Sequence, residues 1–432
     1  MTLKFGTDGV RGAASELTTE LLGRLGAAAR QVLGPGPFLV GRDTRESGPR
    51  IFADLAAGLG DVVDLGVLPT PAVAFASAER GLPAAMISAS HNPYADNGVK
   101  FFLAGGRKLP DDVEERLEAL LADAAVAAVA AIPAVTLDPD PTTAYEAHVA
   151  AEHDLAGLHV VIDCANGAAS QVAPRVLERL GARVDVLHAE PNGTNINDGC
   201  GSTHPQSLQQ AVVANGADVG LAFDGDADRV LAVDAQGNLV DGDQLMAILA
   251  LDLRDQGRLH DDTLVVTVMS NLGLRLAMAE HGITVHETQV GDRYVLEALE
   301  AGGWSLGGEQ SGHVIFRDLA TTGDGLLTGV QLLDVVRRTG RPLHELAAVM
   351  TRLPQILRNV RVASRDGLDQ AADVWAAVHT VEAALGDTGR VLLRPSGTEP
   401  LVRVMVEAAD QATAAEAAET IAAAVETWGT RP

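Results

Sequence analysis

Two short runs of residues in this chain combine the side chains that a phosphoryl-transfer site needs. Asp224, Asp226 and Asp228 stand at alternate positions, so in an extended segment they would point the same way, with α-carbons about 7 Å apart. Carboxylates that close repel each other by about 2 kcal/mol per pair. Mg²⁺, which binds a few carboxylates together with phosphate oxygens, would relieve that repulsion. Ser90, in the run 88–93, offers a hydroxyl that could carry the phosphate. The two runs therefore indicate metal-assisted phosphoryl transfer through a serine.

Residues close to Ser90 in the sequence could assist that transfer, because a serine is a weak nucleophile until it is activated. His91 follows it directly, and Lys100 could carry protons if nearby arginines and the metal lower its pKa. Arg11 is a candidate ligand of the transferring phosphate. It stands in the run 6–12, which is too rich in glycine for a helix or a central strand, so we expect a surface loop there.

The aspartate run has two other interpretations. A calcium-binding EF-hand loop that starts at Asp224 needs glycine at its sixth position and glutamate at its twelfth, but this chain has Arg229 and Ala235 there, so that interpretation fails. The run 226–230, which follows an apolar strand, also resembles the aspartyl-nucleophile loop of haloacid-dehalogenase-type phosphatases. In that case Asp226 would take the phosphate, and this alternative stays open.

Two further loops carry groups suited to a phosphosugar. The run 394–400 could be a helix capping box, because Ser396 precedes Glu399 by three positions. The β-rich stretch that follows favours a strand–loop–strand whose amides and arginines bind phosphate. In a glycine-flanked loop, Glu309 and Ser311 could bind sugar hydroxyls or an amine, while His313 could move protons. The candidate phosphate ligands are Arg394, Ser396, Gly397, Thr398 and Arg403.

The order of apolar and polar stretches predicts an α/β fold with internal repetition. Apolar strands at 83–87, 218–223 and 304–307 each lead to one of the polar loops, and each is preceded by a strand–helix–strand pattern. Ligands of such sheets bind at the carboxyl ends of strands, so the three loops could share one site. We expect three related α/β domains with the serine, metal and sugar loops and a smaller α+β phosphate-binding domain, with boundaries at 1–140, 141–242, 243–353 and 354–432.

Composition narrows the function classes. The chain has 432 residues and a formal charge of −26, which argues against binding to nucleic acids or to anionic membranes, because both need a basic surface. Two cysteines are too few for a disulfide framework and fit a reducing compartment. No basic-then-apolar signal pattern stands at the N-terminus. We therefore expect a soluble cytoplasmic protein without nucleic-acid or membrane partners.

The four motifs, taken together and in order, resemble those of the α-D-phosphohexomutase family over essentially the full chain. They are the runs 88–93, 224–229, 308–313 and 394–400. The run 308–313, followed by 321–325, is most similar to the members of this family that act on glucosamine phosphates. Members that act on mannose or glucose phosphates usually carry methionine where Gln310 stands.

The resemblance implies a heart-shaped arrangement of four domains and an isomerase that interconverts glucosamine 6-phosphate and glucosamine 1-phosphate, feeding UDP-N-acetylglucosamine synthesis. It implies a phosphoserine at Ser90, a bisphosphorylated sugar as intermediate and activator, and Mg²⁺ held by Ser90 and the three aspartates. Arg229 joins the substrate-binding residues. A phosphomannomutase or phosphoglucomutase, the Asp226 phosphatase and a non-catalytic phosphosugar-binding regulator remain alternatives. The general acid or base among Lys100, His91 and His313 and the oligomeric state, with a homodimer among the options, stay open.

Overall fold

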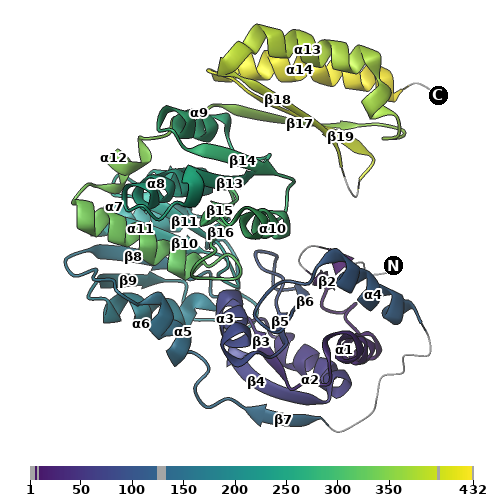
Figure 1. The fold of residues 1–432 in the computed structure, drawn as a ribbon, viewed down its shortest axis with the longest axis vertical. Coiled ribbons are helices and arrows are strands. Elements are labelled where there is room, and N and C mark those ends of the chain that lie inside the picture. Colours follow the sequence, from purple (N-terminus) through teal and green to yellow (C-terminus); the bar gives the residue numbers. More distant parts are fainter. Residues whose placement is uncertain (1–4, 7–8, 124–132, 397–398, 431–432) are drawn as a thin grey trace. The chain divides into compact units, whose positions relative to one another are not determined.

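The computed structural model describes residues 5–6, 9–123, 133–396 and 399–430. Their contacts divide the chain into two units, one made of Met1–Met269 with His281–Val349 and the other of Ser270–Glu280 with Met350–Pro432. The elements are labelled in Figure 1. None of the described helices combines the length and the hydropathy that crossing a bilayer requires.

The first unit contains three sheets that share one pattern of four strands. In the first sheet, β3 (Phe38–Arg42) lies between two parallel neighbours, β4 (Asp61–Val67) and β5 (Ala84–Ile87), and β5 pairs antiparallel with β6 (Asp96–Phe102). The loop between the last two strands carries Ser90.

The second and third sheets repeat this pairing. The second has β8 (His159–Asp163) between β9 (Arg183–Leu187) and β10 (Val219–Phe223), with β11 (Val230–Asp234) antiparallel to β10. The third has β13 (Thr263–Thr267) between β14 (Thr284–Thr288) and β15 (Leu306–Gly308), with β16 (Val314–Phe316) antiparallel to β15. The three polar loops thus occupy the same place in each repeat, which confirms the predicted repetition.

The interpretation of the glycine-rich run 6–12 as a surface loop was wrong for its described residues, 6 and 9–12, which lie in strands. The first sheet continues beyond β6 with β2 (Gly9–Ala13) and β1 (Phe5–Gly6), and beyond β4 with β7 (Ala134–Leu137). Gly9 takes part because its backbone passes so close to β6 that a β-carbon there would lie 2.2 Å from the carbonyl oxygen of Val99. Glycine in this run permits a close strand pairing. The second sheet is extended in the same way by β12 (Leu239–Val240).

Helices pack on these sheets and bury nearly continuous apolar strands, as parallel sheets require. In the first repeat, Leu22, Ile51 and Leu55 of two helices pack with Val40 and Ile87 of the sheet. The helices of this unit are α1 (Thr19–Leu33), α2 (Gly48–Leu59), α3 (Thr70–Arg80), α4 (Asp111–Ala122), α5 (Thr143–Val149), α6 (Ala169–Arg179), α7 (Gln206–Asn215), α8 (Gly242–Asp255), α10 (Asp292–Gly302), α11 (Gly325–Thr339) and α12 (Leu343–Ala347).

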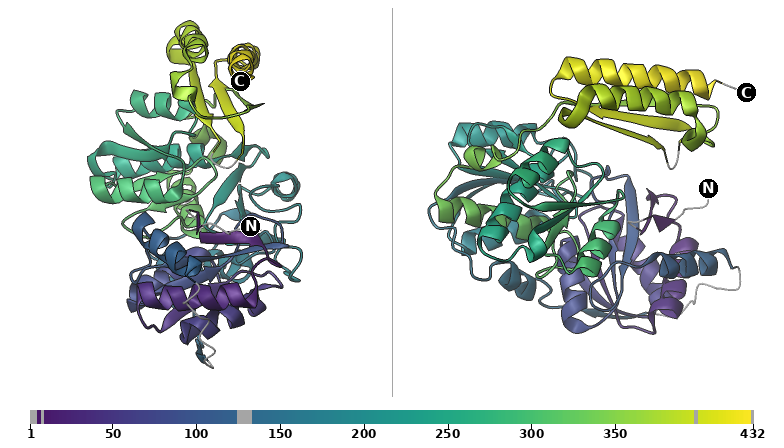
Figure 2. Two further views of the ribbon diagram at one scale, coloured as in Figure 1. Left: turned by 90° about the vertical axis from the view of Figure 1, so that its right-hand side faces the viewer. Right: turned by 45° about the horizontal axis from the view of Figure 1, so that its top comes forward.

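The second unit is the predicted α+β module. Its antiparallel strands lie in the order β17 (Gln355–Arg361), β19 (Leu401–Glu407) and β18 (Arg390–Pro395), and α13 (Ala372–Leu385) and α14 (Gln411–Gly429) lie side by side over one face (Figures 1 and 2). The helix α9 (Leu272–Glu280) belongs to this unit, because the buried Glu407 accepts hydrogen bonds from the N–H of Leu272 at 2.9 Å and from Asn271 at 3.2 Å. The three strands and two long helices confirm the predicted module.

Candidate active site

Ser90 lies at the turn between β5 and β6, and its hydroxyl meets the aspartate run. The residue is buried, and its backbone has φ of +50°, a left-handed value that is unfavourable for a residue with a β-carbon. Its Oγ donates a hydrogen bond of 2.6 Å to Oδ2 of Asp224. The two runs that the sequence singled out therefore meet in the fold, although 134 positions separate these residues.

The three aspartates converge, but not through an extended segment. Residues 224–229 form a turn between β10 and β11, and Ala227 has φ of +57°. The turn is held by Thr70, whose N–H donates to the Asp226 carbonyl at 2.9 Å, and by Gly325, whose N–H donates to the Ala227 carbonyl at 3.0 Å. Despite this different backbone, one oxygen of each carboxylate lies within 4.8 Å of the others.

The described hydrogen-bond donors around this cluster leave two carboxylate oxygens without a hydrogen bond. Oδ2 of Asp226 accepts hydrogen bonds from Thr70 Oγ1 at 2.5 Å and from Lys100 Nζ at 2.9 Å. Oδ1 of Asp226 and Oδ1 of Asp228 are buried and have no hydrogen-bond partner among the described residues. Buried carboxylate oxygens without partners are unfavourable, and oxygen atoms are the ligands that hard divalent cations prefer. The cluster therefore fits a divalent cation.

The carboxyl groups of the cluster differ in the direction of their pKa shifts. Burial raises the pKa of Asp224 well above its ordinary value, and the charges of Asp228 and Asp226 raise it further. Burial acts in the same direction on Asp228, but Lys100 and His313 outweigh it and hold the pKa of Asp228 well below its usual range. Asp224, which faces the Ser90 hydroxyl, is thus the carboxyl of the cluster that most readily takes a proton.

His91 lies between Ser90 and Arg229 in a chain of contacts. His91 Nδ1 lies 3.3 Å from Ser90 Oγ and 3.0 Å from Arg229 Nη1. Burial and the charges of Arg229 and Arg11 lower the pKa of His91, so its ring is neutral and Nδ1 accepts from the guanidinium. The N–H of Arg229 also donates to Asp224 Oδ1 at 3.2 Å. Arg11, half-buried on β2, is close enough to influence His91.

His313 is buried and contacts Asp228. Its Nδ1 lies 3.7 Å from Asp228 Oδ2, its Nε2 lies 3.3 Å from Asp292 Oδ2, and the N–H of Gly323 donates to Nε2 at 3.0 Å. Burial lowers the pKa of His313, but the charges of Asp292 and Asp228 outweigh it and raise the pKa overall. Lys108 forms an ion pair with Asp292. Sequence reasoning missed Lys108 and Asp292.

The glycine-flanked loop between β15 and β16 adjoins the aspartate turn. The carboxylate of Glu309 accepts from the N–H of Gly291 at 3.2 Å and from the hydroxyl of the exposed Ser311 at 3.4 Å. The carbonyl of Gly312 accepts from the N–H of Val230, the first residue of β11, at 3.1 Å. The first unit thus brings together three of the predicted loops, those that carry Ser90, Asp224 and Glu309.

The second unit carries the remaining predicted residues. Arg394 and Arg403 are directly opposite each other on β18 and β19. Burial and the charge of Arg403 lower the pKa of Arg394, and an anion beside the pair would relieve that repulsion. The hydroxyl of Ser396 accepts from the N–H of Glu399 at 3.3 Å, but a strand follows, so the helix capping box is excluded. Residues 397 and 398 lie outside the described residues.

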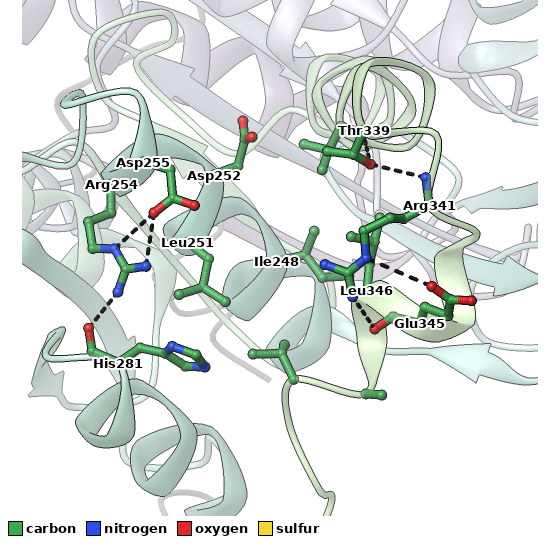
Figure 3. Close-up of a pocket in the computed structure, with 13 residues that line it drawn as sticks. Ile248, Leu251, Asp252, Arg254, Asp255, His281, Thr339, Arg341, Glu345 and Leu346 are labelled. Carbon is green, nitrogen blue, oxygen red and sulfur yellow. Dashed lines mark hydrogen bonds and ion pairs between the residues drawn. The ribbon is translucent and has the colours of Figure 1, made fainter.

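A separate cavity of about 540 Å³ lies among α8, α11 and α12 (Figure 3). Four of its charged side chains form two ion pairs: Arg254 Nη2 lies 2.9 Å from Asp255 Oδ1, and Arg341 Nε lies 3.9 Å from Glu345 Oε2. None of the predicted site residues lines it. The candidate site is therefore the Ser90–aspartate cluster and not this cavity.

Asp324 directly precedes Gly325, whose N–H binds the aspartate turn. The burial of the Asp324 carboxyl makes the stability of the fold depend on pH. Asp324 caps α11 by accepting from the N–H of Leu327 at 2.9 Å, and it accepts from Tyr145 Oη at 2.9 Å. Burial raises its pKa from 3.8 to about 6. The folded chain therefore keeps a proton that the unfolded chain releases, so the free energy of unfolding falls by about 3 kcal/mol as pH rises through that window. Because asparagine cannot ionise, we expect Asp324→Asn to gain stability relative to the wild type between about pH 4 and pH 7.

Thermal unfolding at both ends of this range checks the prediction. Asp410 is the matched control, since it caps α14 but is exposed, and hydrogen bonds from Thr413 lower its pKa. Its stabilising effect is present above its ordinary pKa and is lost as pH falls, so Asp410→Asn should show the opposite trend. A stability difference between Asp324→Asn and the wild type that stays constant with pH would contradict the prediction.

Family models of four domains match the chain, one after another along the sequence. Phosphoglucomutase/phosphomannomutase alpha/beta/alpha domains I, II and III match residues 2–127, 142–237 and 241–353, and the C-terminal domain matches residues 357–424. Proteins named phosphoglucosamine mutase are similar over nearly their whole length. The one from Kineococcus radiotolerans is 56% identical, with 95% of each chain covered, and the one from Clavibacter michiganensis subsp. michiganensis is 55% identical, with 98% of each chain covered.

The fold agrees with a solved relative as well. A phosphoglucomutase/phosphomannomutase family protein from Burkholderia thailandensis has a TM-score of 0.81 at 25% identity, covering 98% of this chain and 97% of that chain. The resemblance inferred from the four motifs is confirmed, and the chain belongs to the phosphoglucomutase/phosphomannomutase family.

Proposed function

We propose that this chain interconverts glucosamine 6-phosphate and glucosamine 1-phosphate, with Ser90 as the carrier of the phosphoryl group. The observation that carries the proposal is the 2.6 Å hydrogen bond from Ser90 Oγ to Asp224, which sets the hydroxyl at a cluster of three buried carboxylates. The relatives that are 53–56% identical over nearly their full length, all named phosphoglucosamine mutase, support this substrate.

The chemistry consists of two phosphoryl transfers. A hydroxyl oxygen of the bound sugar phosphate attacks the phosphorus of phosphorylated Ser90, the bond from phosphorus to Oγ breaks, and the hydroxyl proton passes to a base. The bisphosphorylated sugar then turns over. Ser90 Oγ attacks its other phosphorus, the bond from that phosphorus to the sugar oxygen breaks, and the sugar oxygen takes the proton back from the base. The same bisphosphate, supplied from solution, would activate a chain that has lost its phosphate.

We propose Mg²⁺ as the cation of the cluster, with Ser90, Asp224, Asp226 and Asp228 as its ligands. When bound, it neutralises charge on the transferring phosphoryl group. Oδ1 of Asp226 and Oδ1 of Asp228, which accept no hydrogen bond from the described residues, support this assignment. Lys100 holds both of these carboxylates, at 2.9 and 3.5 Å, and so keeps the ligands in place.

Proton transfer falls to His91 or Lys100. Both lie at the Ser90–aspartate cluster: His91 Nδ1 is 3.3 Å from Ser90 Oγ, and Lys100 contacts two of the aspartates. Both ring nitrogens of His313, in contrast, face other groups, namely Asp228 on one side and Asp292 with the Gly323 N–H on the other. We therefore assign His313 the role of orienting Asp228.

The Asp226 phosphatase is the second candidate, and the contacts of this residue count against it. Its Oδ2 accepts from both Thr70 and Lys100, and its Oδ1 is the oxygen that we assign to the cation, so this assignment leaves neither oxygen to attack phosphorus. Ser90 Oγ, by contrast, lies at the cluster and donates to Asp224 Oδ2 at 2.6 Å.

Turnover of glucosamine, mannose and glucose phosphates, measured side by side, tests the substrate. We expect the highest kcat/KM for glucosamine phosphate. Glu309→Gln should change the ranking of the sugars, because a carboxylate that accepts from hydroxyl or ammonium becomes a mixed donor and acceptor. Arg403→Ala should weaken the binding of all three sugar phosphates to the same extent, because the phosphate group is common to them. The control variants are Glu297→Gln and Arg361→Ala, at exposed positions on α10 and β17. A higher kcat/KM for mannose or glucose phosphate would overturn the substrate assignment.

A further inference from the structure

A buried arginine, Arg45, contacts the backbone of the loop that carries Ser90. Its side chain is fully buried, and its Nε donates to Oδ2 of Asp43 at 2.9 Å. Nη2 donates to the carbonyl oxygens of Ser90 and Asn92, both at 2.9 Å, and Nη1 donates to that of Pro93 at 2.9 Å. One planar guanidinium therefore gathers three carbonyl groups of this loop.

The same loop is held at two further points. The side-chain amide of Asn197, from the loop after β9, donates to the carbonyls of Ser90 at 2.9 Å and Asn92 at 3.1 Å. The hydroxyl of Ser88 accepts from the N–H of Ser90 at 3.0 Å and donates to Asp43 Oδ2 at 2.6 Å. Both backbone polar groups of Ser90 are thus fixed by the network that starts at Asp43.

This network stabilises a backbone conformation that the chain would otherwise avoid. Ser90 has φ of +50°, and a residue with a β-carbon keeps such a value only where its surroundings enforce it. With its carbonyl directed to Arg45 and Asn197, its Oγ is directed to Asp224 at 2.6 Å. Burying a charged pair for packing alone is unfavourable, since apolar side chains fill such space at least as well.

We propose that Arg45 is a positioning residue that sets Ser90 Oγ against the aspartate cluster for phosphoryl transfer. It acts through the three loop carbonyls. This inference rests on the proposed role of Ser90 as phosphoryl carrier. Lysine cannot replace Arg45, because an ammonium group lacks the planar guanidinium that reaches three carbonyl oxygens and a carboxylate at once.

Arg45→Lys tests the proposal, because it keeps the charge and removes the fork. We expect kcat to fall by about 100-fold, as for a reacting group misplaced by about 1 Å, while KM for the sugar phosphate stays unchanged. Arg50→Lys is the matched control, since Arg50 also donates to two backbone carbonyls, those of Ala14 at 2.7 Å and Leu17 at 2.8 Å, but not to the Ser90 loop. Its kcat should stay near the wild-type value.

Asn197→Gly covers the case in which Arg45→Lys does not fold. Glycine tolerates the backbone of this position, where φ is +58°, and the change removes the side-chain amide together with its β-carbon. We expect kcat to fall in the same direction, by about 10-fold, again with unchanged KM. Unchanged kcat in both variants, or a loss that merely follows the fraction of unfolded protein, would overturn the proposal.

The phosphorylation state of Ser90 separates this inference from the proposed function. Mass spectrometry of the wild-type protein, treated with the sugar bisphosphate, shows whether Ser90 carries phosphate. If it carries none, the proposed function fails, and the inference fails with it. If the wild type is phosphorylated at Ser90 and the two variants turn over at the wild-type rate, only the role of Arg45 is refuted.

Discussion

Ser90→Ala is expected to lower kcat of the mutase reaction by at least about 1,000-fold, even with saturating sugar bisphosphate. The reason is that the hydroxyl at the aspartate cluster is the atom that would carry the phosphoryl group, and alanine leaves no oxygen there. Ser170→Ala is the matched control, because that hydroxyl only donates to the carbonyl of Gly167 at the start of α6, at 2.7 Å. Steady-state turnover of both variants with glucosamine phosphate checks the expectation.

The chemical stability of the bound phosphate separates the serine from its rival. A phosphoserine withstands acid, whereas an acyl phosphate on Asp226 is cleaved by hydroxylamine. We expect peptide mapping of active wild-type protein to find one acid-stable phosphate, at Ser90. Undiminished turnover by Ser90→Ala, or a hydroxylamine-labile phosphate on Asp226, would show that the mechanism proposed here is wrong.

The sequence predicted the repeats and the loops because both depend on local patterns. Apolar strands that end in polar runs are visible in the order of residues, and in an open sheet the carboxyl ends of strands gather the loops. The structure places the Ser90, Asp224 and Glu309 loops at equivalent turns of three sheets. The boundaries between the four domains, as given from the sequence, stay a prediction.

Two errors have a common physical cause, namely pairing with distant segments. The glycine-rich run became a strand because β6 offers it a partner: Val10 pairs with Val99 and Arg11 with Gly98. The aspartate run became a turn because Thr70 and Gly325 bind its backbone. Local composition does not reveal such partners.

The residues that sequence reasoning missed act across long separations. Arg45 reaches Ser90 over 45 positions, Asn197 over 107, and Thr70 reaches Asp226 over 156. One signal was available: the chain has only three lysines among 32 basic residues. Two of them form ion pairs at the site: Lys100 is buried and Lys108 is half-buried. A compact ammonium group is retained there although arginine is used almost everywhere else.

Asp226→Asn is the second change with a large expected effect. It removes one negative ligand from the cluster at nearly constant volume, so kcat should fall by about 100-fold or more. The remaining turnover should need a far higher Mg²⁺ concentration than the wild type needs. A chelator should abolish wild-type turnover, and Mg²⁺ should restore it. Asp261→Asn is the control, because this aspartate is exposed and its backbone, with φ of +53°, tolerates asparagine.

Thermal unfolding gives a readout that does not depend on turnover. A ligand that binds only the folded state raises the melting temperature, so Mg²⁺ should stabilise the wild type and Asp261→Asn equally and Asp226→Asn much less. In a chelator this Mg²⁺-dependent difference should vanish, and what remains should reflect the hydrogen bonds that Asp226 accepts from Thr70 and Lys100. Full activity of the wild type in a chelator, together with a melting temperature that does not respond to Mg²⁺, would exclude a metal at this cluster and leave Lys100 as the counter-charge of the aspartates.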